Sequence, residues 1–352
     1  MAHKGVRIPF KHFADVFWPL PEDVTEPPIL TENPFSKATA ATLEQNVAEA
    51  FRQAVAEHNL TPGMDDNGVK EHKIEVDGAF FRDDVPDIPG PTDNRPHYPD
   101  QVVPVKFERG YTVNDPFSDG ADPTPAAESR KAHRVAFFVF VIVGNLCRIT
   151  RWDRSGATFT VSINYYEKWR LFCETLWRMS QCSDEQLGRD PTPVRTSPRH
   201  LLYPVMDLPA QTHPEEIDHM ERPFAEDEPS PSPFARFHCV RDLFCKSISN
   251  GAPRYALEVP HEGTVRHFLV GNAAFKARGM TGRATRGFVA YDAKTGELVW
   301  VKDSWRADHL CVQHEGQILQ ELNDANVPYV PTVLCYKTVT CVAGLSVDTA
   351  TN

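Results

Sequence analysis

Lys302 and Glu315 are the two residues of this sequence whose types and spacing best suit phosphate chemistry. The apolar run before Lys302, in LVWVKDSWR, predicts a strand that ends near the lysine. Apolar residues at i+3, i+4 and i+7 from Glu315, in HEGQILQEL, predict a helix with the carboxylate beside an apolar face that packs on the sheet. A strand lysine can hold phosphate groups, and a helical glutamate can hold the lysine. The pair is therefore our candidate catalytic site.

A glycine-containing turn, in GMTGRATRGFVAYD, lies upstream of this strand. Its glycines, Gly282 and Gly287 among them, lack the G-x-G-x-x-G-x-V spacing of ordinary protein kinases, although Gly287 followed by Val289 suits the last part. A plain hairpin is the alternative interpretation. Trp300 shares a face with Lys302 because strand side chains alternate, whereas most kinases have alanine there. We therefore expect this tryptophan to crowd the place where a base would enter.

The elements around the pair are expected to form a small sheet with one helix. Strands are predicted at RHFLV, GFVAYD and LVWVKD, with AKTGE as a hairpin loop, and VPTVLCYKTV predicts a last strand. Strand, glycine-containing turn, strand, hairpin, lysine-bearing strand and glutamate-bearing helix follow one another as in the N-lobe of a protein kinase. We assign this N-lobe-like region to residues 256–340, with a tail at 341–352.

A second domain is predicted upstream, at residues 36–195. ATLEQNVAEAFRQAVAEHN has the spacing of an amphipathic helix, and INYYEKWRLFCETLWRMSQ reads as another. KIEVDGAFF, QVVPVKFER, VAFFVFVIV, CRITRW and TFTVSI read as strands, so we expect a mixed α/β domain within an α+β chain. Residues 1–35 read as an N-terminal arm. Residues 196–255, rich in proline and acids, read as a linker that cannot bury enough apolar surface to offset its ordering entropy.

Composition and charge limit the classes of function. A chain of 352 residues with a formal net charge of −11 is not expected to be a general nucleic-acid binder, because phosphate affinity is delivered by clustered lysine and arginine. No apolar run reaches the length of a signal peptide or a membrane span, and the eight cysteines form no C-x-x-C pair. We expect an intracellular protein, cytoplasmic or nuclear and not secreted, with no membrane association and no metal-ligand set.

The chain resembles the fungal-type protein kinase family. The segments VDGAFFR, NRPHYPDQVVPV, NDPFSD, RWDRSGA, LWRMS, LGRDPT, MTGRATRGFVAYD, VKDSWR and EGQILQEL carry the resemblance, in the family's order. It implies ATP-dependent phosphoryl transfer to protein serine or threonine, with ATP and magnesium as cofactors. It also implies the ion-pair roles for Lys302 and Glu315. The residues implied to cover or contact the nucleotide, besides Lys302, are Gly282, Arg283, Thr285, Gly287 and Val289.

One departure from the family concerns the end of the printed chain. A kinase needs a catalytic-loop aspartate, a nearby asparagine and an Asp-Phe-Gly aspartate, all downstream of the helix, and the residues after Leu322 contain no such motifs. VRDLFCKSISN precedes Lys302 and lacks the histidine, so it reads as an ordinary helix. We therefore predict an incomplete kinase-like fold that does not transfer phosphate by itself and binds ATP poorly. Either the gene model is truncated or the copy is a degenerate pseudokinase.

A second departure concerns the N-terminal domain, whose strands resemble a restriction-nuclease core. Such a core uses an aspartate and a Glu-x-Lys pair to bind a metal and position water. Asp77 is the candidate aspartate, but Lys106 and Glu108 stand in exchanged order, and a lysine in a ligand position repels a divalent cation. A degenerate metal-dependent nuclease-like domain is thus only the third interpretation.

A non-enzymatic scaffold is the second interpretation of the whole chain. The N-lobe sheet edge, uncovered where the rest of a kinase would lie, would recruit a protein partner or allow self-association. This interpretation predicts association that depends on concentration and no effect of nucleotide.

Overall fold

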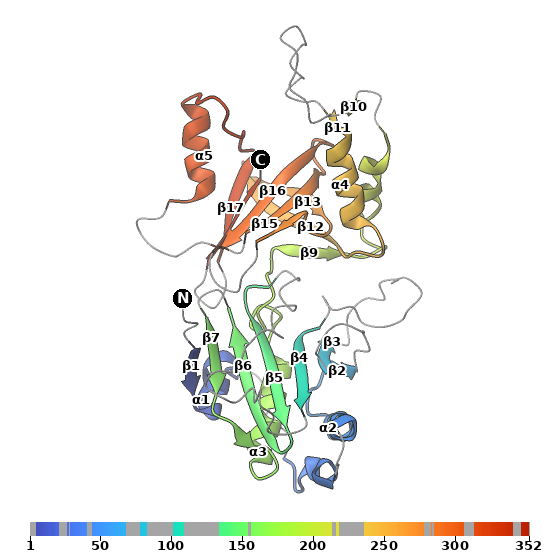
Figure 1. Ribbon diagram of the computed structural model, residues 1–352, viewed down its shortest axis with the longest axis vertical. Coiled ribbons are helices and arrows are strands. Elements are labelled where there is room, and N and C mark those ends of the chain that lie inside the picture. Colours follow the sequence, from blue (N-terminus) through green and yellow to red (C-terminus); the bar gives the residue numbers. More distant parts are fainter. Residues whose placement is uncertain are drawn as a thin grey trace. The chain divides into compact units, whose positions relative to one another are not determined.

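The computed structural model describes most of the chain, as two compact units. The described residues are 5–20, 27, 29–40, 44–67, 78–82, 101–108, 134–153, 156–212, 216–217, 236–277, 283, 285–305, 313–340 and 346–351. Those up to Asp190 form the N-terminal unit, and those from Pro191 onward form the C-terminal unit (Figure 1). The mixture of sheets and helices confirms the predicted α+β class.

The N-terminal unit is built on one mixed sheet. Its strands are β1 Gly5–Ile8, β2 Met64–Asn67, β3 Gly78–Arg82, β4 Val103–Glu108, β5 Phe137–Val143, β6 Leu146–Trp152, β7 Ala157–Thr160 and β8 Ile163–Asn164. The order is β1-β7-β6-β5-β4-β3-β2, with β8 beside β6. The pairs β1–β7 and β4–β5 are parallel. The helices are α1 Phe10–Phe17, the 3₁₀ helix η1 Pro34–Ala40, α2 Glu44–Glu57 and α3 Trp169–Gln181.

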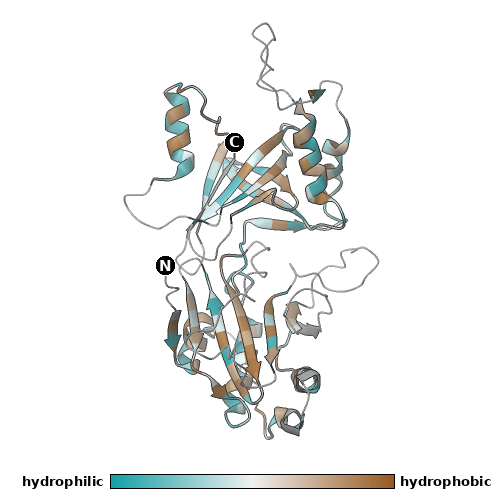
Figure 2. Cartoon of the chain, in the orientation of Figure 1, coloured by the Kyte–Doolittle hydropathy of each residue, from teal (hydrophilic) through white to brown (hydrophobic). Residues whose placement is uncertain are grey.

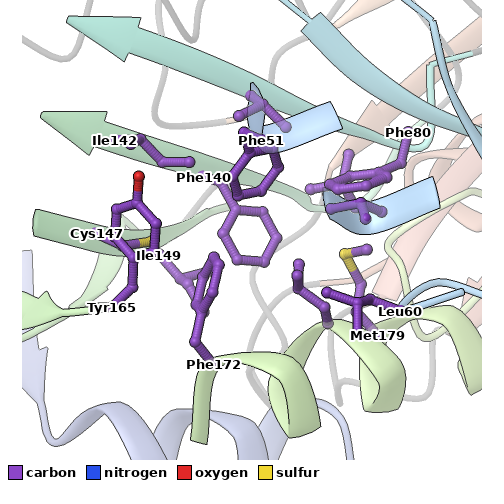
Figure 3. Close-up of a cluster of buried hydrophobic side chains, with 14 of the residues drawn as sticks. Phe51, Leu60, Phe80, Phe140, Ile142, Cys147, Ile149, Tyr165, Phe172 and Met179 are labelled. Carbon is purple, nitrogen blue, oxygen red and sulfur yellow. The ribbon is translucent and has the colours of Figure 1, made fainter. Parts of the chain in front are cut away.

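Aromatic side chains fill the core of this unit. The strand β5 reads FFVFVIV, and hydrophobic residues are concentrated along β4 and β5 (Figure 2). Phe140 of β5 lies at the centre of a cluster whose rings come from several elements (Figure 3). Its ring centroid is 6.1 Å from that of Phe172 on α3 and 6.2 Å from that of Phe80 on β3. Helix and sheet are therefore held together by edge-to-face ring contacts.

The first residues of the chain differ from the predicted arm. The strand β1 pairs with β7, and α1 buries Phe13 completely in the same core. Trp18, just after α1, is also fully buried, with its ring centroid 5.1 Å from that of Phe138. The physical reason is that Phe10, Phe13 and Phe17 recur with helical spacing, so α1 has an apolar face to bury.

The C-terminal unit has a second sheet, which is antiparallel. Its strands are β9 Pro193–Thr196, β12 Arg254–His261, β13 Thr264–Val270, β14 Phe275–Lys276, β15 Arg286–Asp292, β16 Leu298–Trp305, β17 Cys335–Thr340 and β18 Ser346–Thr351. The order is β17-β18-β16-β15-β13-β12-β9, with β14 beside β15. β10 Glu216–Ile217 and β11 Arg236–Phe237 form a separate parallel pair. The helices are η4 Pro204–Ala210, α4 His238–Ile248 and α5 Glu315–Asp324.

Both faces of this sheet bury apolar residues. One face gathers Phe268, Phe288 and Val301 with other residues of the sheet. On the other face, Phe244 of α4 and Met206 of η4 pack with Val289. The helix α4 contacts β13 and β15, whereas α5 contacts β17 and β18 toward the other edge of the sheet (Figure 1).

The ranges predicted to be a linker and a tail both contain strands of this sheet or helices that pack on it. β9, η4 and α4 lie within the range 196–255 or at its edge, and β9 pairs with β12. The tail contributes β18, which pairs with β16 on one side and β17 on the other. Both predictions failed because a strand's partners are decided by distant residues, which composition does not show. The helix α3 also begins later than predicted, at Trp169.

Candidate functional site

The strand β16 presents Lys302 on the sheet face that also carries α5. In the register of the sheet, Lys302 lies opposite Gly287 of β15 and opposite Ala350 of β18. The register is fixed by Arg286, whose Nε donates to Asp303 Oδ2 at 2.9 Å across the two strands. Both side chains of this pair are largely buried, so the pair sets Gly287 beside the lysine.

Lys302 and Glu315 are brought together by the structure. The lysine Nζ donates to Glu315 Oε1 in a salt bridge between β16 and the first turn of α5. The lysine side chain is 28% exposed and the glutamate side chain 33% exposed, so the pair is reachable from solvent. A half-exposed ammonium held in one place by a carboxylate can accept a further anionic ligand, because a lysine has three donors.

The first turn of α5 is held by a glycine contact and a side-chain hydrogen bond. A Cβ on Gly316 would lie 2.3 Å from Cγ of Tyr336, so only glycine permits this approach to β17. His314, which precedes the helix, has its Nδ1 2.9 Å from Thr338 Oγ1. Gly316 is the buried residue of this helix, while Ile318 is 39% exposed. Of the predicted apolar face of α5, Ile318 is therefore exposed, while Leu319 and Leu322 are partly buried.

The residues predicted to cover the nucleotide differ from one another in where they lie. Gly282 lies outside the described residues. The carbonyl oxygen of Arg283 accepts from Trp305 N at 2.8 Å, and that of Thr285 accepts from Ala277 N at 2.8 Å. Gly287 and Val289 share the face of Lys302 because they alternate along β15. Gly287 and Val289 thus lie on the lysine face, and the contact of this set with nucleotide stays a prediction.

Two features of this face affect whether a nucleotide base could bind there: the indole of Trp300 and the packing over Val289. The indole of Trp300 packs against Gly287, since a Cβ there would lie 2.1 Å from Trp300 Cζ2. Val289, which lies opposite Trp300 in the register, is only 4% exposed beneath Phe244 and Met206. Trp300 therefore shares the face of Lys302, and its crowding of a base stays a prediction. The cover by α4 was not predicted, although the spacing of Val240, Phe244 and Ile248 is a signal for it.

The residues of the nuclease-like interpretation are only partly described, and the interpretation stays a prediction. Asp77 and the side chain of Glu108 lie outside the description, and Lys106 lies on β4 between β3 and β5. No group of three His, Cys, Asp or Glu side chains that could hold a metal occurs among the residues placed by the structure. None of the helices in those same ranges combines the length and apolar character needed to span a bilayer.

Comparison with known families gives one match. Residues 240–352 match the family described as fungal protein kinase, which confirms the predicted resemblance for this C-terminal part. The match includes β16, α5 and the strands around them, so Lys302 and Glu315 lie within it. No curated protein and no solved structure matches the chain.

Proposed function

We propose that the C-terminal unit, whose residues 240–352 match the fungal protein kinase family, is a kinase-like domain that binds the phosphate groups of magnesium ATP. The observation that carries the proposal is the salt bridge between Lys302 and Glu315, which joins a strand to the following helix. In protein kinases, the lysine of such a pair holds the nucleotide phosphates. The phosphate end of the ligand fits this site because the ammonium is partly exposed and already oriented.

The proposal concerns binding rather than transfer. Transfer needs an aspartate that accepts the hydroxyl proton and residues that hold magnesium, and the printed sequence after α5 carries no such motifs. Phosphorylation of a serine or threonine therefore stays an expectation from the resemblance. Magnesium would arrive with the nucleotide, bridging its phosphate oxygens.

A thermal unfolding experiment with magnesium ATP tests the proposal. A ligand at about 100 times its Kd stabilises the native state by about 2.7 kcal/mol, so the Tm should rise in the wild-type chain. We expect Lys302→Met to lose this shift. Lys294→Met is the matched control, because Lys294 is an exposed lysine in the hairpin between β15 and β16. A Lys302→Met variant that keeps the full shift would refute phosphate binding at this site.

A second candidate function is protein recruitment through α5 and the segment after it. Ile318 is 39% exposed, Val327 40% and Tyr329 fully exposed, so apolar side chains are gathered on this short stretch. Exposed apolar patches mark interaction sites more often than chance. Sedimentation velocity over a range of concentrations tests this candidate: association that Ile318→Asp abolishes supports it, and a monomer throughout refutes it.

A further inference from the structure

Trp300 lies where the base of a nucleotide would meet the sheet. Strand side chains on one face repeat about every 7 Å, so Trp300 is the neighbour of Lys302 along β16 on that face. Its indole extends sideways onto Gly287, the residue opposite Lys302. The ring therefore fills the space over the glycine that is closest to the lysine.

The face beyond Trp300 is also covered. Val289 lies opposite Trp300, and its side chain packs with Phe244 and Met206, both of which are fully buried. A planar base could reach Val289 only if α4 and η4 moved away. Such a move would expose the apolar residues that those two elements bury, so the cover is stable.

The lysine itself stays accessible, and the described residues around it differ in their exposure. Its side chain is 28% exposed, whereas Ser304, the next residue of β16 on the same face, is only 7% exposed. Past Gly287, the strand β14 carries Phe275, which is 52% exposed, and past Ala350 the strand β17 carries Tyr336, which is 39% exposed. Phosphate groups can thus approach Lys302, whereas the aromatic rings that these described residues offer to a base are themselves partly in solvent.

We propose that this site, if it binds phosphate groups as proposed above, recognises a chain of phosphates and gains nothing from the base. Its ligand class is the triphosphate chain, bound alike whether it is inorganic or carried by a nucleoside. Trp300 is the specificity-determining residue, because it takes the place of the base. A small-ligand site must enclose most of its ligand to bind it tightly, and here the nucleoside would stay in solvent.

Isothermal titration of the whole chain tests this inference. Magnesium complexes of ATP and of inorganic tripolyphosphate are titrated into the wild-type protein, and adenosine is titrated separately. We expect ATP and tripolyphosphate to bind within about threefold of each other and adenosine not to bind. In Trp300→Ala, ATP should bind about tenfold more tightly while tripolyphosphate is unchanged. Leu201→Ala removes an exposed apolar side chain of the same unit and should change neither.

The outcomes separate this inference from the proposed function. If wild-type protein binds ATP more than about tenfold better than tripolyphosphate, the inference is overturned while phosphate binding stands. Weaker ATP binding in Trp300→Ala would mean that the indole stacks on the base, and an ATP preference lost in Phe275→Ala would place the base on β14. If neither phosphate ligand binds wild-type protein, both proposals fail. The wild-type comparison holds even if a variant does not fold.

Discussion

Asp292 shows how one buried carboxylate positions the lysine strand. It lies at the end of β15 and is completely buried. Its side chain accepts hydrogen bonds from Lys294 N at 2.9 Å, from Thr295 Oγ1 at 2.9 Å and from the Arg266 guanidinium. These bonds close the turn that leads into β16, so Asp292 helps to place Lys302 although it lies away from it.

The pKa of Asp292 predicts a pH dependence of stability. Burial alone would raise this pKa, but the bonds from Lys294 N, Arg266 and Thr295 outweigh burial and lower it below its ordinary value of 3.8. A lowered carboxyl pKa stabilises the fold above the ordinary value and loses that contribution as the pH falls through the folded value. We expect Asp292→Asn to cost about 3 kcal/mol at pH 7, because it leaves the buried Arg266 uncompensated.

Urea unfolding at a series of pH values measures this effect. The gap in free energy of unfolding between wild type and Asp292→Asn should narrow as the pH falls below the ordinary carboxyl value of 3.8 and through the lowered folded-state value, because wild-type Asp292 then becomes neutral as well. Asp324→Asn, at the exposed end of α5, is the control and should leave the pH profile unchanged. A gap that stays constant over this range would contradict the assigned role of the ionised carboxylate.

At the scale of elements, α1 and β1 belong to the fold rather than to an arm. Phe13 is fully buried among Phe17, Trp18 and Phe138, whereas Val16 of the same helix is 50% exposed. α1 thus has one face in the core and one in solvent. The same reasoning applies to α4, where Phe244 is fully buried and Leu243 is 45% exposed.

The two faces of α1 give a matched pair of substitutions. Phe13→Ala should lower the free energy of unfolding by about 3–5 kcal/mol, because it leaves a cavity among the rings. Val16→Ala should change it by less than about 0.5 kcal/mol, since an exposed side chain loses little burial. Chemical denaturation of both variants measures the difference. Equal and small effects would mean that the first residues of the chain are not part of the core.

At the scale of the whole molecule, the two units have separate cores. Among the described residues, the aromatic cluster around Phe140 comes from positions up to Leu187, and the clusters around Phe268 and Phe244 come from positions from Leu202 onward. A unit with its own hydrophobic core can unfold as its own cooperative step.

Differential scanning calorimetry tests this separation. We expect two transitions, of which Phe140→Ala lowers one by several degrees through the loss of a fully buried ring. Magnesium ATP should raise only the other transition, because the proposed ligand site lies in the C-terminal unit. A single transition that responds to both the substitution and the ligand would show that the two units unfold together.

The sequence by itself determined the α+β class, most of the strands and the two residues of the ion pair. Those inferences depended on the spacing and type of residues within single segments. The apolar run before Lys302 predicts β16, and the order of a strand lysine followed by a helix glutamate predicts the ion pair. Segments whose composition looked solvated or terminal were misassigned. The residues of these segments form short strands and helices because they pair or pack with residues that are distant in the sequence.

Only the tertiary structure decided what surrounds the lysine. Gly287 lies beside Lys302 because two strands pair in one register, and Val289 is buried because α4 and η4 pack over it. It also placed β18 between β16 and β17, and it left Ile318 of α5 exposed. Register and packing depend on contacts between residues far apart in the chain, so no local pattern can specify which side chain covers which face.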